Sequence, residues 1–225
     1  MVEDDEVFRR ARERLIERLK SLGYIRSKRV EEAMRRVPRH EFVPRELRDR
    51  AYVDSPLPIG KGQTISAPHM VALMTELLDP RPGDKVLEVG AGSGYHAAVV
   101  AELVKPDGKV ITVERIPELA EFARENLRRT GYDRWVEVKV GDGSKGYPPE
   151  APYDRILVTA GAPDVPPSLL EQLKPGGRLV IPVGDRHMQE LWVVEKTKDG
   201  RIRRERHGGC AFVPLVGEEG FPERG

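Results

Sequence analysis

The residues best suited to chemistry lie in one short segment. From position 88 to 94 the sequence reads Glu-Val-Gly-Ala-Gly-Ser-Gly, after an apolar run and before an expected helix. Loops that bind nucleotide phosphates usually read G-x-G-x-x-G, whereas here the glycines alternate and Glu88 stands two residues before the first. A carboxylate in a ligand crevice repels phosphate and attracts an ammonium or sulfonium, so the motif favours S-adenosylmethionine over a dinucleotide. The expected cofactor contacts are Glu88, Gly90, Ala91, Gly92, Ser93 and Gly94.

Two acidic residues end or follow the next two expected strands. Glu114 could accept hydrogen bonds from both hydroxyls of a ribose; the alternative is a surface glutamate paired with Arg115. Asp142 stands between Gly141 and Gly143 and could accept a hydrogen bond from an adenine amino group; the alternative is an ordinary Asp-Gly turn. Because three such elements occupy three successive strand ends, they predict a nucleoside-binding α/β domain. They do not identify a methyl acceptor.

Ser66 precedes Ala67, Pro68 and the apolar positions of an expected helix. We expect the serine to cap this helix, with the proline in its first turn. The free N–H groups and the positive end of the helix would then attract a carboxylate, so Ser66 could bind an acceptor anion without acting as a nucleophile. The stretch from Tyr52 to Thr64 is rich in proline and glycine. We expect it to be an ordered loop that covers an extended peptide.

From residue 85 onward, short apolar strands alternate with amphipathic helices. This pattern predicts an α/β fold with a doubly wound, mostly parallel sheet of the Rossmann-like type. Because no long helices separate the last strands, we expect antiparallel pairing at that edge.

Two amphipathic helices, at 7–22 and after Ser27, form an N-terminal extension. We divide the one compact chain into 1–65, the helices and substrate loop, and 66–225, the cofactor-binding core. The expected strands are 86–89, 109–113, 135–140, 155–159, 178–183, 191–195 and one near 210–215, and the helices between them are 97–104, 117–129 and 168–173.

The composition gives no reason to expect a polyanionic partner. Lys and Arg number 38 against 37 Asp and Glu, for a formal net charge of +1, so nothing attracts the whole chain to nucleic acid or to an anionic membrane. A single cysteine, Cys210, excludes an intramolecular disulfide and fits a reducing compartment. The charged N-terminus and the lack of a long apolar run predict a cytoplasmic protein. We expect a monomer without a metal site, since the histidines lack metal-ligand spacing.

One segment is similar to the signature of a known family. Residues 54–70 read Asp-Ser-Pro-Leu-Pro-Ile-Gly-Lys-Gly-Gln-Thr-Ile-Ser-Ala-Pro-His-Met and resemble the protein-L-isoaspartate O-methyltransferases. Residues 86–95, 153–163 and 173–184 resemble them as well, and the resemblance runs from about residue 10 to 216. The glycine loop and the Leu-Lys-Pro-Gly-Gly segment occur in many methyltransferases. The Gln-Thr-Ile-Ser-Ala-Pro-His segment is specific to this family.

The resemblance implies a reaction and a set of residues. The reaction is methyl transfer from S-adenosylmethionine to the free α-carboxylate of L-isoaspartyl residues in damaged proteins and peptides, which begins their repair. Ser66 would lie at the acceptor carboxylate. The tail from 216 to 225 diverges from other members, which puts any contact from it in doubt. The implied pocket contacts are Gln63, Thr64, Ile65 and His69, and the implied cofactor contacts are the 88–94 loop, Glu114, Asp142 and Gly143; we add Arg115 and Thr159 to the expected cofactor site.

Three other functions remain open at this level. A methyltransferase could act on another acceptor, such as RNA or a small molecule. A nicotinamide-dependent oxidoreductase would share the fold, but Glu88 argues against it. A nucleoside-binding regulator without activity is the third, and the polar loop before Ser66 argues for chemistry instead. For His69, a histidine packed by its neighbours is an alternative to a pocket contact.

Overall fold

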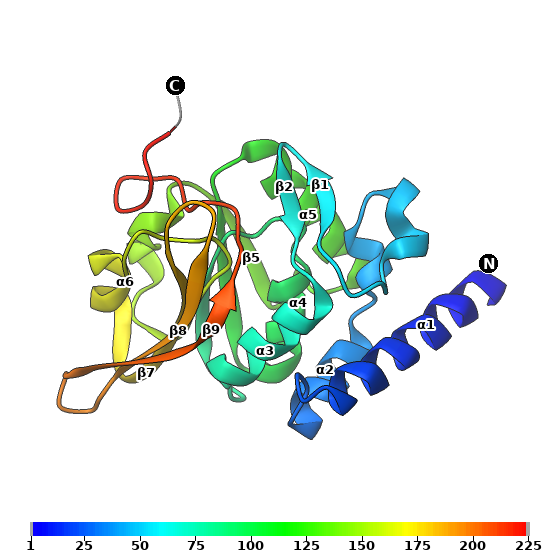
Figure 1. Ribbon diagram of the computed structural model, residues 1–225, viewed down its shortest axis with the longest axis horizontal. Helices are drawn as coiled ribbons and strands as arrows, with labels where there is room; N and C mark the ends of the chain where they lie inside the picture. The colour runs from blue at the N-terminus through cyan, green and yellow to red at the C-terminus, as the bar shows by residue number, and fades with distance from the viewer. Residues whose placement is uncertain (1, 224–225) are drawn as a thin grey trace.

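A seven-stranded sheet forms the centre of the protein (Figure 1). The structure, a computed structural model, describes residues 2–223. The strand order is β5-β4-β3-β6-β7-β8-β9; the first five strands are parallel, and β8 and β9 are antiparallel to their neighbours. The predicted fold class and antiparallel edge are confirmed. The strands are β3 (Lys85–Val89), β4 (Lys109–Glu114), β5 (Val136–Val140), β6 (Tyr153–Val158), β7 (Leu173–Gly184), β8 (Gln189–Lys196) and β9 (Ile202–Cys210).

Both faces of the central strands β3 and β4 are buried, and successive side chains of each strand point to opposite faces. Val86 and Val110 belong to one hydrophobic cluster, together with apolar residues of α3, α4 and α5. Leu87 and Ile111 belong to the other cluster, together with α6. Polar Glu88 and Thr112 therefore point to the α3 and α4 side of the sheet. The helices are α3 (Pro68–Leu78), α4 (Tyr95–Val104), α5 (Pro117–Thr130) and α6 (Pro167–Gln172).

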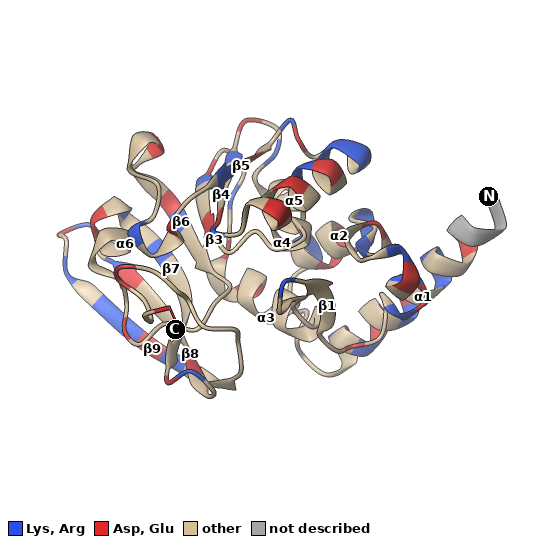
Figure 2. Cartoon of the chain, turned by 90° about the horizontal axis from the view of Figure 1, so that it is seen from above, with Lys and Arg blue, Asp and Glu red and all other residues tan. Residues whose placement is uncertain are grey.

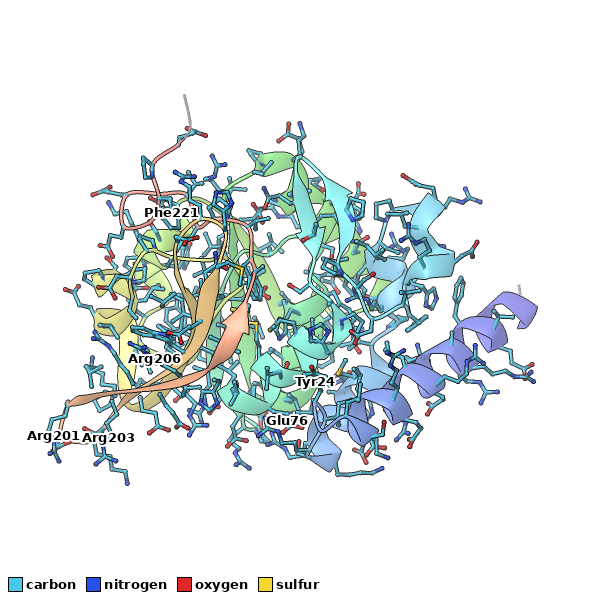
Figure 3. The ribbon with its side chains drawn as sticks, viewed as in Figure 1. Tyr24, Glu76, Arg201, Arg203, Arg206 and Phe221 are labelled. Atoms are coloured by element: carbon cyan, nitrogen blue, oxygen red, sulfur yellow. The ribbon has the colours of Figure 1, made fainter. Side chains whose placement is uncertain are left out.

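The N-terminal helices α1 (Val2–Ser21) and α2 (Lys28–Arg36) extend this first cluster. Ser27 caps α2, since its hydroxyl accepts a hydrogen bond from the Val30 N–H at 3.2 Å. The Glu76 carboxylate accepts the Ser27 N–H at 2.8 Å and so ties α2 to α3 (Figure 3). Two short 3-10 helices, η1 (Arg39–Phe42) and η2 (Arg45–Arg50), follow α2. Within residues 2–223, no helix combines the length and the apolarity needed to cross a bilayer.

The predicted loop from Tyr52 to Thr64 is wrong for its second half, which is a β-hairpin. Its strands are β1 (Leu57–Gly60) and β2 (Gln63–Ile65). Both turn residues, Lys61 and Gly62, have positive φ angles, of 53° and 70°, which is the conformation of a tight two-residue hairpin turn. The strands are too short to show a period of two. Lys61 at the hairpin tip forms an ion pair of 2.6 Å with Glu118 of α5.

The last strand lies earlier than predicted. Strand β9 covers 202–210 rather than 210–215. It forms the edge of the sheet, most of its side chains are exposed, and Arg203 and Arg206 lie along it (Figures 2 and 3). An edge strand exposed on both faces carries no apolar pattern. The apolar residues that follow return to the centre of the sheet instead, because Gly161 exchanges hydrogen bonds of 2.8 Å with the backbone of Val213 and Leu215.

Candidate active site

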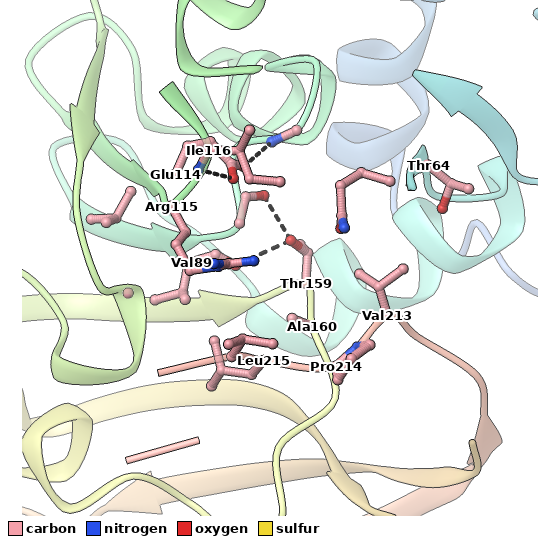
Figure 4. A pocket seen from close by; sticks show the side chains of 16 residues that line it. Thr64, Val89, Glu114, Arg115, Ile116, Thr159, Ala160, Val213, Pro214 and Leu215 are labelled. Atoms are coloured by element: carbon pink, nitrogen blue, oxygen red, sulfur yellow. Dashed lines mark hydrogen bonds between the residues drawn. The ribbon is translucent and has the colours of Figure 1, made fainter. Parts of the chain in front are cut away.

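The carboxyl ends of the parallel strands open into a cleft of about 120 Å³ (Figure 4). Ligands of open α/β sheets bind at this edge. A second cavity, of about 40 Å³, adjoins the cleft. Four residues line both: Thr64, Gly90, Gly92 and Thr159.

The structure brings most of the predicted site residues to these two spaces. The cleft contains Gln63, Thr64, Gly90, Gly92, Glu114, Arg115, Gly143 and Thr159. The second cavity contains Ile65, Ser66, Glu88, Ala91 and Ser93. Three predicted residues line neither of them: His69, Gly94 and Asp142.

The glycine loop is shaped by close contact with β6. Gly90 has a φ angle of 96°, and a Cβ atom there would lie 2.5 Å from Oγ1 of Thr159. That hydroxyl donates a hydrogen bond of 2.7 Å to the Gly90 carbonyl (Figure 4). Only glycine fits both the φ angle and the contact. The exposed backbone of the loop therefore forms part of the cleft wall.

Glu114 is a fixed, buried acceptor in the cleft. One of its carboxylate oxygens accepts the Gly92 N–H and the other accepts the Ile116 N–H, each at 3.0 Å. The residue is 7% exposed, and Arg115 pairs with Glu223 instead. The alternative of a surface ion pair between Glu114 and Arg115 is therefore wrong. Each oxygen keeps a further lone pair, so the carboxylate fits a pair of neighbouring hydroxyls such as those of ribose.

Glu88 differs from the expected charged carboxylate. It is 1% exposed and accepts a hydrogen bond on Oε2 from the Thr112 hydroxyl. Burial, together with the nearby Glu114 carboxylate, raises the pKa of Glu88 to about 8. At neutral pH the side chain is thus largely protonated, and it lies beneath the glycine loop in the second cavity. A positively charged ligand group beside Glu88 would favour the ionised carboxylate over the protonated form.

Asp142 is occupied by protein hydrogen bonds. Oδ1 accepts from the N–H and the hydroxyl of Ser144, at 2.9 and 2.7 Å, and Oδ2 accepts from the Glu218 N–H at 2.8 Å. The Ser144 contacts match the alternative of an Asp-Gly turn. Its neighbour Gly143 lines the cleft, whereas Asp142 does not. The adenine contact predicted for Asp142 stays a prediction.

Ser66 does not cap α3 as predicted. Pro68 takes the first helical position, which proline prefers because its missing N–H would have no partner there. Ala67 is therefore the N-cap residue. The carboxylate of Asp54, from the chain before the hairpin, accepts the His69 N–H at 2.9 Å. A second carboxylate at this helix end would meet the charge of Asp54. The Ser66 hydroxyl has no hydrogen-bond partner among residues 2–223, and Ser66 lines the second cavity.

His69 is held by its neighbours. Its ring lies 2.9 Å from Asp54 through Nδ1 and 5.0 Å, between centroids, from the Tyr24 ring. This placement matches the alternative of a packed histidine. The ring tilts over Tyr24, and both side chains come from elements outside the cleft.

Sequence reasoning missed the wall formed by the C-terminal segment. Residues 213–216 line the cleft. The segment is fastened to helix α6, since the Glu219 carboxylate accepts hydrogen bonds from the N–H and the hydroxyl of Ser168. A Cβ atom at Gly217 would lie 2.0 Å from Asp142. The apolar run at 210–215, which predicts a strand, is the sequence signal for this wall.

Fold and site together define a class of protein. A sheet of this order, a glycine loop after β3 and a buried carboxylate at the end of β4 characterise the S-adenosylmethionine-dependent methyltransferases of Rossmann-like fold. One similar solved structure is a Plasmodium falciparum protein assigned as a protein-L-isoaspartate O-methyltransferase, in complex with S-adenosyl-L-homocysteine. Its TM-score is 0.80 at 30% identity, over 91% of this chain and 98% of that one. Another protein-L-isoaspartate O-methyltransferase has a TM-score of 0.82 at 33% identity, over 93% of this chain and 67% of the other.

Sequence comparison identifies the family within that class. The model of the protein-L-isoaspartate(D-aspartate) O-methyltransferase family matches residues 10–220. A protein-L-isoaspartate O-methyltransferase of Methanopyrus kandleri is 86% identical over 99% of both chains. One of Hyperthermus butylicus is 65% identical over 98% of this chain and 94% of the relative. The chain belongs to the protein-L-isoaspartate O-methyltransferase family, and the resemblance read from its sequence is confirmed.

Proposed function

We propose that this protein transfers a methyl group from S-adenosylmethionine to the free α-carboxylate of L-isoaspartyl residues in damaged proteins and peptides. One observation carries the proposal. The family-specific segment at 63–69 supplies residues to both spaces: Gln63 and Thr64 line the cleft, and Thr64, Ile65 and Ser66 line the second cavity. The segment thus stands where a donor in the cleft would meet an acceptor.

The cleft residues fit the cofactor. The Glu114 carboxylate, held by two backbone N–H groups, suits the ribose hydroxyls. The alternate glycines let a nucleoside approach the main chain, and Glu88 offers a buried carboxyl group for a positive charge. When bound, S-adenosylmethionine supplies a methyl group made electrophilic by its sulfonium.

The acceptor site needs no general base. An α-carboxylate has a pKa of about 3.3–3.7 in model peptides, so it is ionised at neutral pH and already nucleophilic. The Ser66 hydroxyl can donate a hydrogen bond that orients the carboxylate. Correct alignment of two reacting groups contributes on the order of 7–11 kcal/mol. The hairpin, attached at its tip to Glu118, would exclude water from above. Because attack neutralises both charges, a dry site does not oppose it.

The test is transfer of a labelled methyl group to paired peptides that differ only in isoaspartyl or aspartyl linkage, with an RNA as a third acceptor. We expect labelling of the isoaspartyl peptide alone. Equal labelling of the aspartyl peptide, or labelling of RNA, would contradict the proposed acceptor.

Ser66→Ala tests the role of the serine. Loss of a hydrogen bond to a charged group costs about 1.5–3 kcal/mol, so kcat/KM for the isoaspartyl peptide should fall at least tenfold. Calorimetry with S-adenosylhomocysteine should show nearly unchanged affinity. Ser21→Ala, at the exposed end of α1, is the matched control. Equal losses of activity and cofactor affinity would place Ser66 on the cofactor instead.

A further inference from the structure

At the second cavity, two buried hydrogen-bonding atoms have no partner among residues 2–223. They are Oε1 of Glu88 and Nδ1 of His96, and both residues line the cavity. Glu88 is 1% and His96 7% exposed. A buried polar atom without a partner is destabilising, so the pair points to a ligand that supplies hydrogen bonds. The Glu88 side chain comes from β3, and His96 lies in the first turn of α4.

The hydrogen bonds of Thr75 define the tautomer of His96. The Thr75 hydroxyl donates its one hydrogen to the Val71 carbonyl at 2.7 Å and lies 2.9 Å from Nε2 of His96. The hydroxyl must therefore accept from His96, which places the ring hydrogen on Nε2. Burial, with a smaller effect of the buried Arg39 charge, lowers the pKa of His96 to about 3. The ring is neutral at physiological pH, and Nδ1 presents a lone pair.

Nδ1 of His96 thus offers an acceptor, and Oε1 of Glu88 becomes a second acceptor once its carboxyl group is ionised. A phosphate or carboxylate group would find no hydrogen there from His96, and it would be repelled by an ionised Glu88. A compact cation with several N–H groups satisfies both atoms at once, because an ammonium has three donors and no acceptor. Such a cation would also favour the ionised form of Glu88.

The position of the cavity indicates which ammonium fits. It joins the cofactor cleft through the glycine loop, with Gly90 and Gly92 lining both. With its ribose at Glu114, S-adenosylmethionine has one further part long enough to pass this loop, the methionine end, which carries an α-ammonium. We propose that His96 is a cofactor-binding residue whose Nδ1 atom accepts a hydrogen bond from that ammonium, beside Oε1 of Glu88. The inference rests on the cofactor of the proposed function and not on the acceptor.

Two substitutions separate this role from a structural one. His96→Gln places an amide nitrogen near the position of Nε2 and keeps the bond to Thr75, but it removes the acceptor at Nδ1. His96→Asn places an amide oxygen near Nδ1 and gives up the bond to Thr75. The probes are S-adenosylhomocysteine and its desamino analogue, which lacks only the α-amine. Both are titrated by calorimetry against the full chain.

We expect His96→Gln to weaken S-adenosylhomocysteine about ten- to hundredfold, as for a hydrogen bond to a charged group, and to leave the desamino analogue within about threefold. His96→Asn should keep most of the affinity for both. In the unaltered protein, the ¹⁵N resonance of Nδ1 should shift with S-adenosylhomocysteine and stay in place with the analogue.

Three results would overturn the inference. Equal weakening of both ligands by His96→Gln would mean that the residue only supports the fold. Unchanged affinity for S-adenosylhomocysteine would mean that water alone fills the cavity. Equal binding of both ligands by the unaltered protein would place the ammonium elsewhere. These binding measurements use no peptide. They can therefore be interpreted even if the isoaspartyl carboxylate proves not to be the methyl acceptor.

Discussion

Replacement of Glu88 by glutamine should change how the stability of the ligand-free protein depends on pH. Burial raises the pKa of Glu88 from the usual 4.5 to about 8. Between these two values the folded protein keeps a proton on Glu88 that the unfolded chain releases. The free energy of unfolding contributed by this group is therefore fully present below pH 4.5 and is lost as the pH rises to 8.

The magnitude follows from the interval. Each pKa unit corresponds to about 1.4 kcal/mol, so the wild-type protein should lose roughly 4 kcal/mol between pH 5 and pH 8 through Glu88. Glutamine is neutral at every pH and has no such dependence. The stability of Glu88→Gln relative to the wild type should accordingly rise by roughly that amount over the same range.

The assay is chemical unfolding at 25 °C from pH 5 to pH 9, followed by the fluorescence of Trp135 and Trp192. Glu102→Gln is the control, because the same substitution there should change stability with a different dependence on pH. Although burial opposes it, hydrogen bonds from its basic and tyrosine neighbours hold the pKa of Glu102 below its usual value. Its stabilising effect is present above the usual pKa and lost in acid, so the control difference should be flat above pH 5. A flat profile for Glu88→Gln as well would refute a protonated Glu88.

Three further substitutions test the site. Glu114→Gln leaves one oxygen to serve two backbone N–H groups and a ribose, so calorimetry should show affinity for S-adenosylhomocysteine at least tenfold weaker; unchanged affinity would remove the residue from the ribose site. Asp54→Ala removes the acceptor at the start of α3 and should lower the free energy of unfolding by about 1 kcal/mol, whereas an unaltered unfolding curve would show that the helix needs no cap. Gly217→Ala places a methyl group 2.0 Å from Asp142 and should displace the cleft wall, with several-fold weaker cofactor binding. Gly209→Ala is the control: its added Cβ atom would lie 4.0 Å from the nearest atom, so this variant should bind the cofactor with normal affinity. Equal cofactor affinities of the two glycine variants would contradict a role of the C-terminal segment as cleft wall.

The sequence predicted the parts of the fold that depend on local patterns. The central parallel strands β3 and β4 are buried on both faces, so an apolar run such as 86–89 identifies a strand without knowledge of its neighbours. The glycine loop was found for the same reason, since its backbone conformation is written in its own residues. The Glu114 carboxylate follows from its place at a strand end.

What could not be predicted depends on contacts between distant segments. The cap of α3 comes from Asp54, and the competition between Asp54 and Ser66 for that role is invisible before the chain folds. Besides the nearby Ser144, Asp142 accepts a hydrogen bond from the N–H of Glu218, 76 residues later. Burial of Glu88 by the helices above it, and hence its raised pKa, is likewise a property of packing.

The central claim is that the methyl donor lies along the strand ends with its sulfur directed at Ser66. The most direct measurement is a crystal structure of the protein with S-adenosylhomocysteine. We predict ribose hydroxyls within hydrogen-bond distance of the Glu114 carboxylate and a sulfur atom that faces the Ser66 hydroxyl. A sulfur atom that faces away from Ser66, or a ribose bound elsewhere, would contradict the account.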